Sequence, residues 1–182
     1  MKPRPDHINL AQHNMFRAGH VTDELRLKLT VQNVEVLLLQ GPYATNNKPQ
    51  TLASQVKILT SNSVDEYTWA TIAVTNPKIT VTNLKHFGNC NRTVTEIVKD
   101  HYKFYVLSGY LSPNQDPTRL LNHPRGILYS LRSSNIILGM DSNAHSTSRS
   151  STNTDSAGEA IKMFIAQHDL TNQQILHFVL II

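Results

Sequence analysis

The sequence predicts a layered α/β fold of the α+β type, in a single domain that covers residues 1–182. The chain has 182 residues, of which 40% are hydrophobic and 16% charged, which suits one globular domain with a substantial core. Segments with strand patterns and segments with helix patterns follow one another in mixed order. Two crossovers that contain helices flank a run of hairpin-like strands, which favours layered sheets over a purely doubly wound parallel sheet.

The first quarter of the chain contains one strongly predicted strand. A short strand is expected at 7–10 ("HINL"), and the apolar spacing over 11–31 then predicts a helix. Residues 34–40 ("VEVLLLQ") are apolar at consecutive positions, as expected for a strand that is covered on both faces. The composition of 44–50 ("ATNNKPQ") predicts a loop.

The rest of the chain reads as successive strands, then a helix, a strand and a helix. Alternating or continuous apolar patterns predict five strands, at 55–60, 68–75, 78–84, 93–98 and 103–111. Helical spacing predicts a helix over 118–131, which Pro124 and Gly126 weaken. A buried strand at 135–141 ("NIILGMD") ends on an acid, and a polar loop leads to a last helix at 159–170.

Charge and cysteine content narrow the functional classes only slightly. Seventeen basic and thirteen acidic residues give a net charge of +4, which permits binding to a polyanion without requiring it. The single cysteine, Cys90, cannot form an internal disulfide, so a reducing, intracellular compartment is expected. The apolar tail at 175–182 is far shorter than the roughly 20 residues that span a bilayer, so no membrane role is expected.

The strongest local signal for chemistry is "NIILGMDSNAH", where Asp141 ends a strand and Asn143 and His145 follow at alternate positions. A carboxylate at the end of a strand can hold a metal ion or orient a water, and a short amide can bind a phosphate oxygen. Asp-Ser-Asn is also a common turn opening, so a purely structural role stays open. P-loop, G-x-G-x-x-G, paired C-x-x-C and H-E-x-x-H motifs do not occur.

Two weaker signals lie at other predicted strand ends. Tyr110, in "LSGYLSP", stands where a strand leaves the sheet, and its phenol can donate to a phosphate or simply pack. Asn9 is an amide at the end of the possible first strand. Each of them means little alone.

Taken in order, "INL", "LLLQGPY", "SGYLSP", "DSNAHS" and "AGEAIKMFIAQHDL" resemble the apurinic-type endonuclease domain of non-long-terminal-repeat retrotransposons, over roughly residues 7–172. That domain belongs to the endonuclease/exonuclease/phosphatase superfamily. The resemblance implies a four-layer α/β/β/α sandwich and a divalent metal, usually Mg²⁺. It also implies phosphodiester hydrolysis that nicks target DNA for retrotransposition.

The resemblance also implies roles for individual residues. Asp141 corresponds to the aspartate that orients or deprotonates the attacking water, and Asn143 to the amide that binds a phosphate oxygen. Tyr110 corresponds to the tyrosine near the scissile phosphate. His145 matches a histidine that is frequent in this branch, with no role assigned here. Asp155 lies before the last helix, where the family often has an acid.

Two departures from the family pattern imply impaired catalysis. Asn9 matches the amide beside the metal, but Gly41 stands where the family has its chief metal ligand, a glutamate. A hard cation needs anionic oxygen ligands, so Mg²⁺ binding should be weakened. The family's Ser-Asp-His motif occurs nowhere in the sequence. The domain is therefore expected to be incomplete at its C-terminus, with the last strands of one sheet missing.

Three other interpretations remain open. The chain can be a catalytically inactive DNA-binding module, a non-functional fragment of a retroelement, or a relative that acts on a phosphorylated small molecule or lipid. The sequences of the motifs resemble the retroelement branch more closely than relatives that act on a phosphorylated small molecule or lipid. The resemblance implies DNA as the partner, a fused or lost reverse transcriptase domain, and the nucleus as the location.

Overall fold

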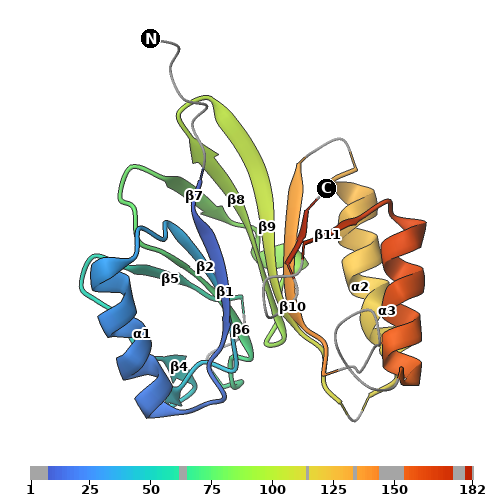
Figure 1. Ribbon diagram of the computed structural model, residues 1–182, viewed down its shortest axis with the longest axis horizontal. Coiled ribbons are helices and arrows are strands. Elements are labelled where there is room, and N and C mark those ends of the chain that lie inside the picture. Colours follow the sequence, from blue (N-terminus) through green and yellow to red (C-terminus); the bar gives the residue numbers. More distant parts are fainter. Residues whose placement is uncertain are drawn as a thin grey trace.

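Two β-sheets pack face to face and helices cover both outer faces, so the predicted four-layer α/β/β/α arrangement is confirmed (Figure 1). The computed structural model describes residues 8–61, 65–113, 115–132, 135–143, 154–173 and 179–181. Helix α1 (Gly19–Val31) covers one sheet, and α2 (Pro117–Ser130) and α3 (Ser156–Gln167) cover the other. No helix within these ranges is long and apolar enough to cross a membrane.

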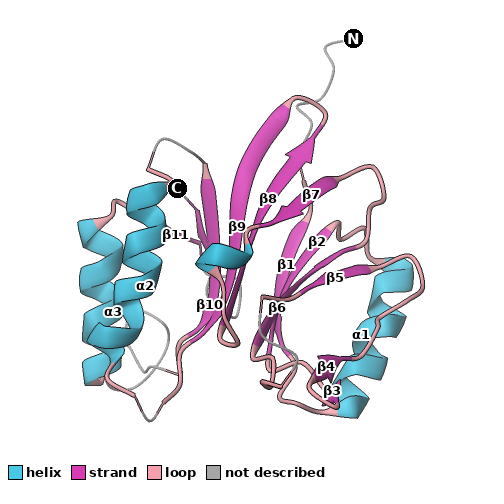
Figure 2. Cartoon of the chain, turned by 180° about the vertical axis from the view of Figure 1, so that it is seen from behind, coloured by secondary structure: helices cyan, strands magenta, loops and turns pink. Residues whose placement is uncertain are grey.

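The smaller sheet has four strands in the order β1-β2-β6-β5. Its members are β1 (Leu10–Asn14), β2 (Val36–Gln40), β6 (Ala70–Val74) and β5 (Lys57–Leu59). Strand β1 runs parallel to β2, and β6 runs antiparallel to it. Every residue of β2 is buried, as the continuous apolar run predicts. A small hairpin of β3 (Ala44–Thr45) and β4 (Lys48–Pro49) lies beside α1, where the sequence predicts only a loop (Figure 2).

The larger sheet has six strands in the order β11-β12-β10-β9-β8-β7. Its members are β7 (Thr80–Asn83), β8 (Arg92–Lys99), β9 (Tyr102–Tyr110), β10 (Ile136–Asp141), β11 (Thr171–Gln173) and β12 (Val179–Ile181), with a 3-10 turn η1 (Lys85–Phe87) after β7. Strands β9 and β10 are parallel. Strand β12 comes from the apolar tail and pairs antiparallel with β10, so the tail covers the edge that β10 would otherwise present.

The predicted helix over 11–31 is wrong in its first half. Residues 10–14 form β1 and extend past the predicted strand at 7–10, and the helix begins only at Gly19. Strand β1 is the edge strand of its sheet and is partly exposed, so its sequence "LAQHN" is too polar to show an apolar strand pattern. Its pairing with β2, from Leu10 with Val36 to Asn14 with Gln40, decides the structure instead.

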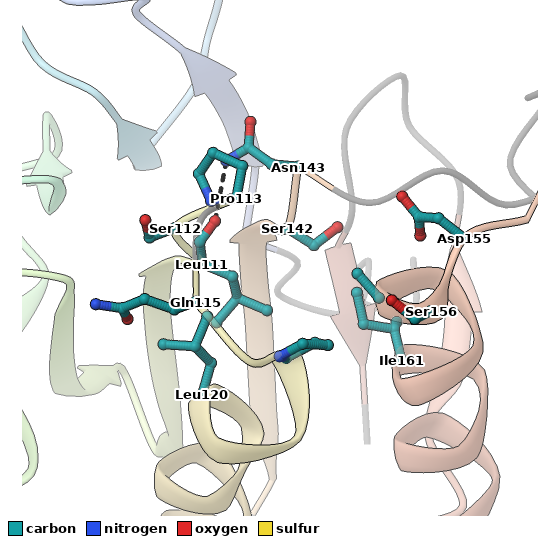
Figure 3. Close-up of a pocket in the computed structure, with 12 residues that line it drawn as sticks. Leu111, Ser112, Pro113, Gln115, Leu120, Ser142, Asn143, Asp155, Ser156 and Ile161 are labelled. Atoms are coloured by element: carbon teal, nitrogen blue, oxygen red, sulfur yellow. Dashed lines mark hydrogen bonds between the residues drawn. The ribbon is translucent and has the colours of Figure 1, made fainter.

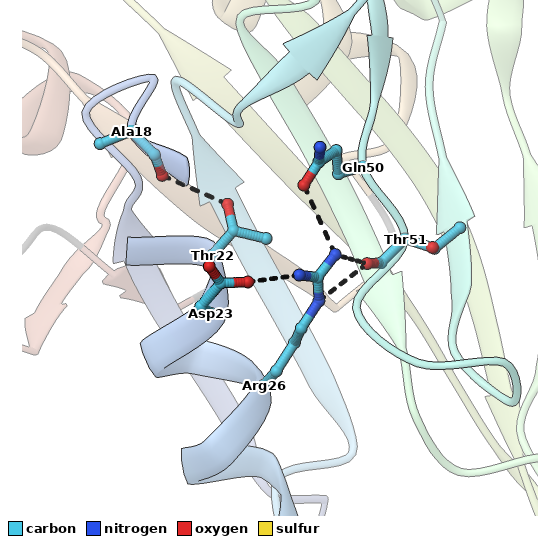
Figure 4. A network of polar contacts seen from close by, with 6 residues as sticks. All are labelled: Ala18, Thr22, Asp23, Arg26, Gln50 and Thr51. Carbon is cyan, nitrogen blue, oxygen red and sulfur yellow. Dashed lines mark hydrogen bonds and ion pairs between the residues drawn. The ribbon is translucent and has the colours of Figure 1, made fainter. Parts of the chain in front are cut away.

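Helix α1 is held by polar contacts as well as by apolar packing. Arg26 donates from Nη2 and Nε to the carbonyl oxygen of Thr51, at 2.6 and 3.2 Å, and its Nη1 pairs with Asp23 (Figure 4). Leu25 packs into a cluster with Leu37 and Leu39 of β2. These contacts tie the helix to the smaller sheet and so hold the turn at 15–18 that precedes it.

A buried polar layer joins the two sheets near one edge of the sandwich. Gln40 is fully buried, and its Nε2 donates to Ser108 Oγ at 2.9 Å and to the Gly139 carbonyl at 3.3 Å. Its Oε1 accepts from Gln12 Nε2 at 3.0 Å, and Ser108 Oγ donates to the Leu39 carbonyl at 3.3 Å. These partners offset the cost of burying the Gln40 amide and link β2 to β9 and β10.

Gly139 lets the two sheets approach at this layer. A Cβ atom at position 139 would lie 2.7 Å from Leu38 Cδ2 and 3.0 Å from Gln12 Oε1, closer than normal contacts allow. The glycine is needed here for lack of space, because the opposite sheet fills the volume that a side chain would occupy.

We predict that Gly139→Ala lowers the free energy of unfolding by roughly 1–3 kcal/mol, because overpacking forces the sheets apart. Urea denaturation measures the change. The control is Gly126→Ala in α2, where nothing lies within 4 Å of an added Cβ. That variant should be stabilised by up to about 1 kcal/mol through helix propensity. Equal effects of the two variants would show that the sheets do not pack as closely as described.

Candidate active site

Four strand ends with chemically relevant side chains meet at one edge of the sandwich. Asn14 ends β1, Tyr110 ends β9 and Asp141 ends β10, while Gly41 follows β2. Asn14 Nδ2 donates to Asp141 Oδ2 at 2.6 Å, so the site bridges the two sheets. The pairing of Tyr110 with Asp141 in the larger sheet puts both of these sequence-predicted residues beside each other.

The turn after β2 begins with a glycine, Gly41. Gly41 has φ +55°, a left-handed conformation that glycine adopts without strain. Its N–H donates to the Trp69 carbonyl at 2.8 Å, and its carbonyl accepts from Arg17 N at 2.7 Å. A Cβ atom at position 41 would lie 3.6 Å from Asn14 Oδ1. A side chain at this position would therefore begin beside the Asn14–Asp141 pair.

Asn9 does not lie at this site, which corrects its predicted position. It precedes β1, at the end of the strand opposite to Asn14. Its N–H donates to Glu35 Oε2 at 3.0 Å, and its carbonyl accepts from Glu35 N and Val36 N. Because β1 extends to Asn14, the amide at the carboxyl end of the strand is Asn14, five residues later than the sequence pattern indicates.

Asn143 and Asp155 line a common pocket beside the strand ends (Figure 3). The pocket measures about 170 Å³ and lies between the loop after β9, the end of β10 and the start of α3. Asn143 Nδ2 donates to the Leu111 carbonyl at 3.0 Å, and its N–H donates to Asp141 Oδ1 at 3.2 Å. Asp155 caps α3 by accepting from Gly158 N at 2.6 Å. The predicted His145 lies outside the described residues.

An aromatic row extends the site on the side of the smaller sheet. The Tyr110 and Trp69 rings stack with centroids 4.8 Å apart and 15° between their planes. Tyr67 meets Trp69 edge to face at 4.9 Å. The Arg17 guanidinium lies over both, 4.4 Å from the Tyr67 centroid and 5.0 Å from that of Trp69. The row therefore carries a cation next to the residue predicted to face the scissile phosphate.

The hydroxyl of Tyr67 is held in its protonated form. Burial raises the pKa of Tyr67, and the nearby Arg17 cation only partly opposes this. The hydroxyl donates to the Pro42 carbonyl, in the turn that contains Gly41. Tyr67 thus connects the aromatic row to the turn whose side chain is missing.

The donors at the site fit a hard divalent cation poorly. Asp141 supplies the one carboxylate of the Asn14–Asp141 pair, and Asn14 Oδ1 already accepts from Phe16 N at 3.0 Å. Over the described part of the chain, no group of three or more His, Cys, Asp or Glu side chains could hold a metal ion. Mg²⁺ is normally bound through one or two carboxylates together with substrate phosphates. The Asn14–Asp141 pair, with its single carboxylate, lies at the lower end of that range.

With this geometry established, comparisons with known proteins identify the class of fold. The structure matches the endonuclease domain of TRAS1, a telomere-specific non-LTR retrotransposon, with a TM-score of 0.82 and 21% identity, over 93% of this chain and 74% of that one. An endonuclease/exonuclease/phosphatase family protein from Leptotrichia buccalis matches with a TM-score of 0.56 and 10% identity, over 91% and 74% of the two chains. The chain has the endonuclease/exonuclease/phosphatase fold.

Two further comparisons refine this result. D. rerio TDP2 complexed with single-strand DNA product matches with a TM-score of 0.54 and 12% identity, over 91% of this chain and 68% of that one. Residues 104–178 match the family model described as endonuclease-reverse transcriptase. No curated protein sequence matches the chain. The family model and the TRAS1 structure together confirm the resemblance to the non-LTR retrotransposon endonuclease domain.

Sequence reasoning missed four residues of the site, namely Asn14, Arg17, Tyr67 and Trp69. Asn14 carries a usable signal, because Gln12 and Asn14 alternate as they would on one face of a strand. Trp69 precedes the buried run of β6 and looks like a core residue in the sequence. Arg17 lies in a turn, and only the packing of that turn against Trp69 brings it to the site.

The environment of Asn9 generates a prediction about the opposite edge of the sandwich. Burial acts to raise the pKa of Glu35, but hydrogen bonds from Asn76 and Asn9 and the Lys99 cation outweigh it and leave the pKa lowered. A lowered folded-state pKa means that the carboxylate stabilises the protein above the ordinary glutamate value of 4.5. This contribution is lost as the pH falls through the folded-state pKa.

We therefore predict that Glu35→Gln destabilises the protein at pH 7 by roughly 1–3 kcal/mol and reduces its sensitivity to acid. Denaturant unfolding between pH 7 and pH 3 measures both effects. The control is Glu24→Gln, which removes an exposed carboxylate paired with Lys28 on α1 and should change stability little. If both variants lost stability with acid as steeply as the parent, the Glu35 cluster would not contribute as described.

Proposed function

We propose that this chain is an endonuclease-type domain that binds the phosphodiester backbone of DNA and hydrolyses it weakly or not at all. The observation that carries the proposal is the 2.6 Å hydrogen bond between Asn14 and Asp141, which assembles a polar site across two sheets beside Gly41. The endonuclease-reverse transcriptase family match over residues 104–178 supports a nuclease role.

The side chains at the strand ends suit the handling of a phosphodiester. Asp141 is an acceptor that can orient an attacking water or take its proton. Tyr110 presents a phenol beside Asp141 that can donate to a phosphate oxygen. Asn143 uses one amide hydrogen for the Leu111 carbonyl and retains a second for a phosphate oxygen.

Gly41 is the reason to expect low activity. A divalent cation bound beside Asn14 and Asp141 would supply charge neutralisation at the phosphate. Position 41 begins 3.6 Å from Asn14 Oδ1, so a carboxylate there would complete the ligand set, and glycine supplies none. We therefore propose that magnesium dependence is retained only weakly and that the hydrolytic step is impaired.

A DNA-binding module without hydrolysis is the second candidate, favoured by the same replacement. Loss of a carboxylate makes the site less negative, and the chain carries a net charge of +4. We propose in addition that the chain acts together with a reverse transcriptase, as part of a retroelement in the nucleus, and the match to an endonuclease-reverse transcriptase family supports the first part of this.

The proposal predicts little conversion of supercoiled plasmid to the relaxed circle in the presence of Mg²⁺. Asp141→Ala should reduce any residual nicking to background, while binding to DNA persists. Agarose gel electrophoresis measures the conversion, and Arg132→Gln, at the opposite edge of the sandwich, serves as the control that should not change it. Rapid nicking by the parent chain that depends on Asp141 would contradict the claim of impairment.

A second prediction concerns the lost ligand. Gly41→Glu should cost about 1–2 kcal/mol of stability without metal, because a side chain at φ +55° is strained. Addition of Mg²⁺ should then raise its melting temperature more than that of the parent, because ligand binding stabilises the folded state. Gly41→Ala controls for the backbone strain without adding a carboxylate. Equal responses of the two variants to Mg²⁺ would argue against a metal position beside Asn14.

A further inference from the structure

The turn that carries Arg17 has an unusual backbone. Phe16 and Arg17 have φ values of +50° and +56°, so two consecutive residues with side chains adopt the left-handed conformation. Such strain persists only when surrounding contacts hold it, and it gathers at functional sites. Here Phe16 N donates to Asn14 Oδ1 at 3.0 Å and Arg17 N donates to the Gly41 carbonyl at 2.7 Å. The strained turn is therefore hydrogen-bonded directly to two positions of the site.

The side chain of Arg17 is positioned by rings and not by a carboxylate. Its guanidinium lies over Tyr67 and Trp69, and Trp69 in turn stacks on Tyr110. Stacking fixes the plane of the guanidinium, one hydrogen bond goes to the Tyr67 side chain, and the remaining edge N–H groups can reach an anion. Arg17 is exposed, so a ligand can reach it.

Several other cations of the described chain are neutralised by a carboxylate. Arg26 pairs with Asp23, Lys99 with Glu35 and Lys103 with Glu96. Among the described residues, no carboxylate oxygen lies within 4.0 Å of the Arg17 guanidinium, the limit for an ion pair. Within the described residues its positive charge is therefore not paired with a carboxylate, and it lies next to a turn whose first residue, Gly41, carries no side chain.

We propose that Arg17, seated on Tyr67 and Trp69, is a phosphate-binding residue that contacts the nucleic-acid strand at the Asn14–Asp141 site. This inference rests on the proposed function. It names one residue that contacts the DNA strand that the site is proposed to bind. Arg17 supplies a fixed positive charge to a phosphate oxygen. That charge attracts the anionic strand to a site that holds a single carboxylate, Asp141.

A salt-dependence experiment tests this proposal. Fluorescence anisotropy of a labelled oligothymidylate strand is measured at several salt concentrations for the full chain, for Arg17→Gln and Arg17→Lys, and for Arg132→Gln. Arg132 is a matched control, because it also lies over a tyrosine ring, 5.2 Å from the Tyr129 centroid, but just after the far end of α2. The emission of Trp69, the only tryptophan in the chain, reports whether the strand reaches the aromatic row.

Arg17→Gln should weaken binding on the order of tenfold at low salt and lower the slope of log affinity against log salt by about 0.7, the value for one contact to a single strand. Arg17→Lys should keep the slope, since it keeps the charge, but bind more weakly because the stacking is lost. Arg132→Gln should leave both quantities unchanged. The parent should also show a change in Trp69 emission on binding.

Other outcomes separate the two proposals. If Arg17→Gln binds with the affinity and slope of the parent, Arg17 serves only to stabilise the aromatic row and the inference is wrong, while the proposed function stands. If Arg17→Gln and Arg132→Gln weaken binding equally, the effect is general surface charge and the inference is again wrong. If the folded parent binds no DNA at any salt concentration, the proposed function fails and the inference fails with it. Thermal melts establish that every variant is folded.

Discussion

The hydrogen bonds of the Gln40 amide are the constraint on which the site depends. They join β2 of one sheet to β9 and β10 of the other, one layer beneath the strand ends. A buried amide with unmade hydrogen bonds is costly, so this layer allows essentially one register between the sheets. Because Gln40 precedes Gly41, and Ser108 and Gly139 stand two residues before Tyr110 and Asp141, that register also sets which side chains meet at the edge. The hydrogen bonds of the core therefore set which side chains lie together at the site.

The turn that follows β2 is fixed by backbone contacts and not by a side chain at its first residue. The turn at Gly41 is held by backbone hydrogen bonds to Trp69 and Arg17, which do not need the side chain of residue 41. A side chain at position 41 is therefore not needed to hold the turn. The same edge of the sandwich holds the Asp141 carboxylate and the Arg17 guanidinium, which forms no ion pair within the described residues.

The two edges of the sandwich differ in how their charged side chains are paired. At the Asn9 edge, Glu35 accepts hydrogen bonds from three different groups, and its charge is met by Lys99. At the other edge the backbone is strained at Phe16 and Arg17, and the Arg17 guanidinium rests on aromatic rings without an ion-pair partner among the described residues. The strained turn and its arginine lie at the edge where a ligand is proposed to bind. This distribution is typical of a fold that carries its function at one end of its strands.

The sequence by itself determined the layered α/β class, the fully buried strand β2 and the helices α2 and α3, because apolar periodicity is a local property. The grouping of Tyr110, Asp141 and Asn143 was implied by the family resemblance of their motifs and not by periodicity. It misplaced the amide of the first strand, because β1 is a polar edge strand whose extent is decided by pairing with β2 and not by its own composition. Only the tertiary structure brought Asn14 to Asp141 across two sheets and Arg17 onto Trp69, because both contacts join segments far apart in the chain. Contacts of this kind form only when the two sheets and the turns at their edge pack together, and the local sequence around each residue does not show its distant partner.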